Sequence, residues 1–196
     1  MRLIHTASML LMSSLALTLA IGLTAVPTQA QATAETSAVA EVISVFGEGT
    51  LTVPAEFKKG KPASRIVQYE FVASAGEGDD VATARVYAMP SGGGVGPNIA
   101  RWKAQFSGNE DAFKQEEMKL GDWKVYLVDH AGKFSERMGG GPFAPGKTVV
   151  REDYAMTGAI IESQKGQLYF VKMVGPQDVV KANREAFVKM IKSIQD

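Results

Sequence analysis

The feature that most constrains the fold is a set of alternating apolar and polar runs separated by short links. Trp123, Val125 and Leu127 alternate with other residues, and residues 154–161 (YAMTGAII) and 168–174 (LYFVKMV) form two further runs. This alternation is typical of half-buried β-strands. A parallel crossover needs about a dozen residues or more, so links as short as 163–166 favour antiparallel pairing. The sequence predicts a mostly antiparallel sheet.

Two segments have the period of an amphipathic helix. Ile99, Trp102 and Phe106 fall on one helical face, which predicts a helix over about 97–107. A continuous apolar stripe predicts a second helix over about 176–194, with Pro176 at its first position. The two helices must bury their apolar faces against the sheet. The expected class is therefore α+β, with about 6–7 strands covered by two main helices.

The first 32 residues have the three parts of a secretory signal peptide. Arg2 supplies a basic start, residues 7–26 carry no charge, and Pro27 precedes the small residues Ala30 and Ala32. We expect cleavage after Ala32, a flexible leader over 33–40, and one α+β domain over 41–196. The expected location is outside the cytoplasm, periplasmic or extracellular. An uncleaved anchor is the alternative, since about 20 apolar residues can span a bilayer.

The composition of the remaining chain argues against several classes of partner. The whole chain has 21 basic and 21 acidic residues, and loss of Arg2 with the signal leaves a net charge near −1. Bulk electrostatics would therefore attract neither nucleic acid nor an anionic membrane. No stable membrane insertion is expected after cleavage. The chain has no cysteine, which excludes a lipid-anchored N-terminus, and it offers no cofactor or metal motif.

Residues 141–148, GPFAPGKT, match the phosphate-binding loop pattern G-x-x-x-x-G-K-[ST]. A working phosphate loop follows a parallel strand and opens a helix, whose free N–H groups hold the phosphates. Here Pro142 and Pro145 lack an N–H, and the residues after Thr148 have the pattern of a strand. The match is interpreted as a coincidence of composition.

Few residues of the chain are candidates for a catalytic role. His130 is the single histidine beyond the signal, and it is interpreted as an ordinary polar residue at the end of a strand. No G-x-S-x-G motif is present, although Ser135 lies nearby in the sequence. A small hydrolase or other enzyme that uses His130 and the following loop is kept as an alternative.

Residues 131–147 form the segment that most resembles a binding loop. This segment is rich in glycine and carries the candidate binding residues Arg137, Phe143 and Lys147. Phe134, Met138 and Phe143 are expected to be exposed there. Long loops are uncommon and are often functional, so a partner or anion site is one interpretation. The other interpretation is a flexible surface loop.

The order of elements, with LYFVKMVGP followed by AFVKMIKSI, resembles the PsbP-like fold. The segments NIARWKAQF, MGGGPFAPG, DYAMTGAIIE and YFVKMVGP are also similar to a group of exported bacterial proteins of unknown function. The resemblance spans roughly residues 50–194 and implies an α/β/α sandwich. It transfers no catalytic residue, because one fold hosts many functions.

These observations favour a non-catalytic binding or accessory protein of the cell envelope. Its partner would be another envelope protein or a small ligand, and the sequence leaves the oligomeric state open. A structural or stress-related envelope protein without a defined pocket is a further alternative.

Overall fold

The computed structural model describes residues 40–139 and 146–196, and for Arg137 and Met138 it describes the backbone alone. The expected signal peptide with Ala30 and Ala32, nearly all of the expected leader, and Phe143 lie outside the described residues.

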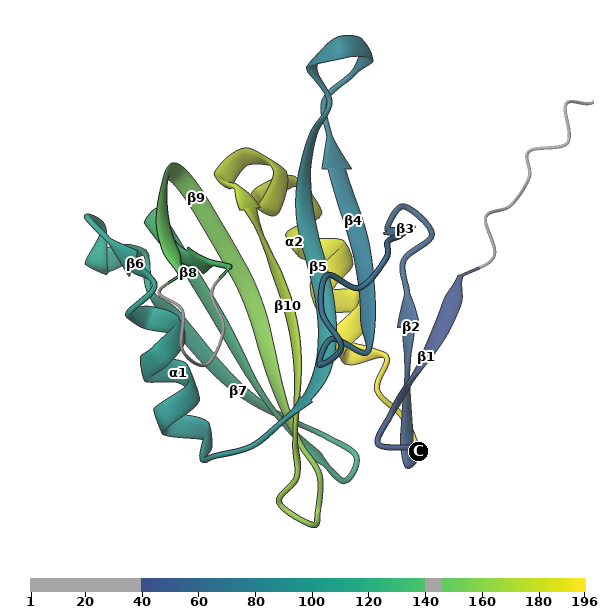
Figure 1. The fold of residues 1–196 in the computed structure, drawn as a ribbon. Helices are drawn as coiled ribbons and strands as arrows, with labels where there is room; N and C mark the ends of the chain where they lie inside the picture. The colour runs from purple at the N-terminus through teal and green to yellow at the C-terminus, as the bar shows by residue number, and fades with distance from the viewer. Residues whose placement is uncertain (1–39, 140–145) are drawn as a thin grey trace, which may run out of the picture. The chain divides into compact units, whose positions relative to one another are not determined.

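The described residues form an α+β fold around an antiparallel sheet (Figure 1). Eight strands of the described chain build this sheet in the order β3-β4-β5-β10-β9-β8-β6, and β7 also pairs with β8. The strands are β3 (Lys58–Lys59), β4 (Tyr69–Ala75), β5 (Ala82–Ser91), β6 (Phe106–Ser107), β7 (Lys114–Leu120), β8 (Trp123–Met138), β9 (Lys147–Glu162) and β10 (Leu168–Pro176). A separate hairpin joins β1 (Glu41–Val45) to β2 (Gly49–Val53).

The α+β class and the mostly antiparallel sheet are confirmed, but the predicted number of about 6–7 strands is too small. The difference comes partly from β3 and β6, which contain two residues each. A strand of two residues has no room for an alternating pattern, so its sequence carries no signal.

A helix packs on each face of the sheet. Helix α2 (Gln177–Lys192) and the β1–β2 hairpin share one apolar cluster with inward residues such as Phe71, Leu127 and Tyr169. Helix α1 (Val95–Lys103) packs on the opposite face, where Trp102 meets Phe170 edge to face at 5.0 Å between ring centroids. Both faces of the central strands are therefore buried.

Both helices are shorter at their C-terminal ends than predicted. Helix α1 spans Val95–Lys103 instead of about 97–107, because Phe106 and Ser107 pair with β8 as β6. Helix α2 ends at Lys192 instead of about 194. Pro176 ends β10 and occupies the N-cap position of α2, one residue before the first helical position.

The prediction of a long loop over 131–147 is wrong. Strand β8 continues to Met138 and β9 begins at Lys147, so most of this segment is paired sheet. The predicted exposure of Phe134 is also wrong, because its ring is buried in the cluster under α1. Gly132 lies where β6 approaches β8. A Cβ at Gly132 would stand 2.5 Å from the carbonyl oxygen of Ser107, so a side chain has no room there.

Candidate functional site

One cavity among the described residues lies on the α2 face of the sheet. Its volume is about 570 Å³, and it is bounded by β7, by β8 and β9, and by the first half of α2. We call this cavity the β7–α2 groove. Short side chains, Ala131 and Ala155 among them, line it. The size falls in the range of about 300–1,000 Å³ that is usual for small-molecule sites.

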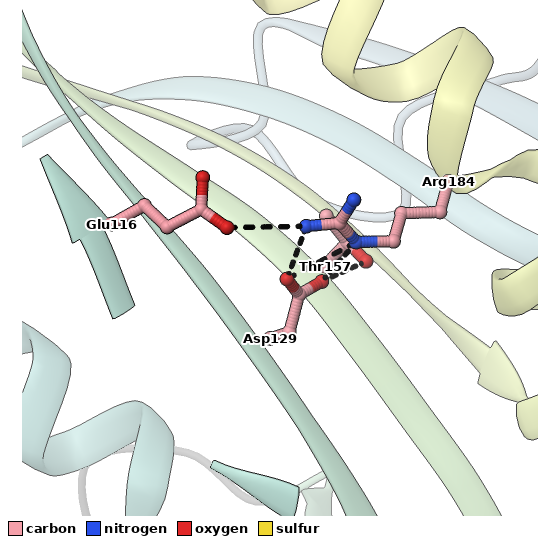
Figure 2. Close-up of polar contacts among 4 residues, drawn as sticks. All are labelled: Glu116, Asp129, Thr157 and Arg184. Atoms are coloured by element: carbon pink, nitrogen blue, oxygen red, sulfur yellow. Dashed lines mark hydrogen bonds and ion pairs between the residues drawn. The ribbon is translucent and has the colours of Figure 1, made fainter. Parts of the chain in front are cut away.

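A hydrogen-bonded cluster lies in the groove (Figure 2). Arg184, on α2, donates from Nε to both carboxylate oxygens of Asp129 at 3.1 Å and from Nη2 to Oδ2 at 2.7 Å. Thr157 Oγ1 donates to Asp129 Oδ1 at 2.7 Å. Asp129 and Thr157 are direct cross-strand partners on β8 and β9, so the sheet register itself brings them together. The carboxylate is thereby held between a strand and a helix.

The ion pair of the cluster holds the Arg184 guanidinium in place and contributes little to the stability of the fold. The hydrogen bonds to Asp129 raise the pKa of Arg184, which stays fully charged. The Arg184 side chain is 41% exposed, so water screens the pair, and exposed ion pairs contribute about 0–1 kcal/mol. Glu116 on β7 lies 3.9 Å from Arg184 Nη2 and adds a weaker attraction. The principal effect is a guanidinium held in one orientation.

No protein-family model matches the chain, and no curated protein matches it. The case for a function therefore rests on the geometry of the site. Among the described residues, no three histidine, aspartate or glutamate side chains gather as metal ligands. No helix in the described part of the chain has the length and apolar character needed to span a membrane.

His130 follows Asp129 in β8 and is among the residues that line the groove, while its ring packs toward the other face of the sheet. It lies within the strand and is 4% exposed, so the interpretation as a polar residue at a strand end is wrong. Its ring packs against Phe106 and Phe113 at centroid distances of 4.9 and 5.5 Å. Burial, and then the charge of Lys103, lower the pKa of His130. Its Nδ1 accepts a hydrogen bond from the Ala131 amide at 3.0 Å, which fits a neutral imidazole.

The structure does not bring Ser135 to His130. His130 and Phe134 both pack against Phe106, so they share the α1 face. Ser135 follows Phe134 in the same strand, and successive strand side chains point to opposite faces. The pairing that a serine nucleophile needs is therefore missing.

A buried lysine was missed by the sequence reasoning. Lys172 on β10 is 2% exposed, and its Nζ lies 2.6 Å from Gln105 Oε1 and 5.2 Å from the centroid of the Trp102 ring. Burial lowers its pKa to about 7. The signal was present in the sequence as a single charge in the otherwise apolar run LYFVKMV.

Of the three binding residues predicted from the sequence, the structure describes the side chain of Lys147 alone. Lys147 is exposed at the first position of β9, opposite Met138, and it does not line the groove. Arg137 lies in β8 opposite Thr148, with its side chain undescribed. Phe143 lies outside the described residues. Lys147 and Thr148 of the phosphate-loop pattern belong to β9, so the described part of that pattern enters a strand and not a helix.

Proposed function

We propose that this chain is an exported, non-catalytic binding or accessory protein of the cell envelope, and that its partner or ligand occupies the β7–α2 groove. The observation that carries the proposal is the cluster of Arg184, Asp129 and Thr157 beside small apolar side chains. A concave, mainly apolar site with a few fixed polar groups is the usual form of a binding site.

The proposal includes the export inferred from residues 1–32 and the PsbP-like resemblance. The helix–sheet–helix layering supports the latter. The enzyme alternative receives less support. The imidazole of His130 packs against two phenylalanine rings, and within the described residues no hydrogen bond joins it to a serine.

The test is capture from the native envelope with a variant whose groove is filled. Ala131 is half-buried at the groove, and Ala131→Trp places an indole in that space. Val81 is 47% exposed and does not line the groove, so Val81→Trp adds the same side chain elsewhere. Far-UV circular dichroism should show that both variants are folded.

Protein and small-molecule mass spectrometry would then identify what co-purifies with each chain. Species that are retained by the wild type and by Val81→Trp, but lost from Ala131→Trp, are the expected result. An identical set of species for all three chains would overturn the assignment of the groove.

A further inference from the structure

The charges around the β7–α2 groove favour an anion. Three cationic side chains line it, Lys114, Lys181 and Arg184, against the two carboxylates of Glu116 and Asp129. The Asp129 carboxylate already accepts hydrogen bonds from Arg184 and Thr157, so it has little capacity left for a cationic ligand. Within residues 40–139 and 146–196, neither lysine of the groove forms an ion pair. The groove therefore attracts negative charge.

Arg184 presents unused hydrogen-bond donors. Its Nε and Nη2 face Asp129, and no described residue accepts a hydrogen bond from Nη1. Figure 2 shows this third nitrogen pointing away from both carboxylates. Because the Asp129 carboxylate holds the guanidinium in place, Nη1 can bind a second acceptor with little further loss of side-chain freedom. Carboxylate oxygens are well matched to such donors.

Much of the remaining lining is apolar, although Thr157, Gln177 and His130 also contribute to it. Ala112, Ala131, Ala155 and Val180 surround the cavity beside the cationic groups. An inorganic anion would leave this apolar surface exposed to water, whereas a ligand with an apolar body would cover it. The ligand should therefore combine one negative head group with an apolar part.

We propose that the β7–α2 groove binds a small amphipathic carboxylate. Its head group accepts hydrogen bonds from Arg184 Nη1, with Lys181 and Lys114 contributing long-range attraction. Its apolar part lies on Ala131, Ala155 and Val180. This inference rests on the proposed function, because it names the ligand chemistry of the same groove.

The experiment compares three probes of matched shape on the full chain: octanoate, its neutral isostere octanamide, and the cation octylammonium. Amide NMR shifts report both the affinity and the place of binding. We expect octanoate to shift the amides of Ala131, Ala155 and Gln177, and to bind at least about tenfold more tightly than octanamide. Octylammonium should bind most weakly. Added salt should reduce the preference for octanoate, because the lysines act through screened charge.

Two exposed residues of the groove provide matched variants with opposite signs. Glu116 is 60% exposed, and Glu116→Gln removes a repulsive charge, so octanoate should bind roughly twofold more tightly. Lys181 is also exposed, and Lys181→Gln should weaken the binding of octanoate by a similar factor. Neither variant should change the binding of octanamide. General damage to the fold would weaken binding in both variants, so the opposite signs identify a charge effect.

The outcomes separate this inference from the proposed function. Equal binding of octanoate and octanamide at the groove would refute a carboxylate site and leave a binding groove intact. If octanoate shifts only amides outside the groove, the carboxylate inference is refuted. The same follows if octanoate does not bind at millimolar concentration. The capture experiment with Ala131→Trp decides the function of the groove independently of these probes.

Discussion

Replacing Lys172 with methionine should make the protein more stable near neutral pH and remove part of its pH dependence. Lys172 is 2% exposed on the central strand β10, and its Nζ has one neutral oxygen acceptor, that of Gln105. The described residues place no carboxylate within ion-pair distance of it. Methionine has a similar unbranched shape, so it fills the same space without a charge to desolvate.

The magnitude follows from the pKa. Burial lowers the pKa of Lys172 from the ordinary 10.5 to about 7, so the folded state binds fewer protons than the unfolded state between these values. Since a tenfold change in the acid dissociation constant corresponds to about 1.36 kcal/mol, the full penalty of about 5 kcal/mol applies below the folded pKa. The penalty fades as the pH rises from about 7 towards 10.5, because the folded lysine is then neutral and the free-energy cost of removing its proton falls with each pH unit.

The expected observable is a difference between two pH values. Unfolding by urea, followed by far-UV circular dichroism, gives the free energy of unfolding of wild type and Lys172→Met at about pH 7 and about pH 9. The advantage of Lys172→Met should shrink by about 2–3 kcal/mol over this interval. Circular dichroism is preferable to tryptophan fluorescence, because Trp102 lies beside the titrating amine.

Lys124→Met is the matched control, since Lys124 is exposed on β8. This variant should show no such pH dependence relative to the wild type. An advantage of Lys172→Met that is equal at both pH values would mean that the amine keeps its ordinary pKa, and the reasoning would fail. A variant that is less stable than the wild type at neutral pH would show that the contacts with Gln105 and Trp102 outweigh the burial of charge.

Two further predictions concern the packing of α1 and the N-terminus. A Cβ at Gly158 would stand 2.6 Å from the Trp102 ring, so Gly158→Ala should lower the free energy of unfolding by about 1–3 kcal/mol, whereas Gly96→Ala, with open space around it, should not. Equal urea midpoints for the two variants would contradict the packing argument. If the signal is cleaved as proposed, intact-mass measurement of the exported protein should give a chain that begins near Thr33; a mass that includes residues 1–32 would exclude cleavage.

Much of the fold could be predicted from local patterns, because the long elements repeat a pattern several times. The pairing of β9 with β10 and the position of α2 follow from such repeats. The extension of β8 beyond Ala131 could not be predicted, because Gly132 is typical of a loop. Glycine is needed there because the backbone of β6 passes too close for a Cβ. That contact depends on the folded arrangement and has no trace in the sequence around Gly132.

The site was harder to predict than the fold. Thr157 lies 28 residues from Asp129, and Arg184 lies 55 residues from it, so no local spacing connects them. The register of β8 on β9 brings the first pair together, and the packing of α2 across the sheet adds the arginine. A weak signal existed, since Asp129 and Thr157 are polar residues within otherwise apolar runs. Without the strand register, such residues cannot be assigned to one another.

The alternation within β8 affects how mutations at its centre should be interpreted. Asp129 holds Arg184 at the groove, while its neighbour His130 packs against Phe106 on the α1 face. A truncation of His130 opens space under α1 and can displace β8, so it can weaken binding at the groove without any chemical role for the imidazole. Loss of function in His130→Ala is therefore no evidence for catalysis. Glu116 and Lys181 provide the cleaner evidence, because their exposed side chains change the charge of the groove and leave the core intact.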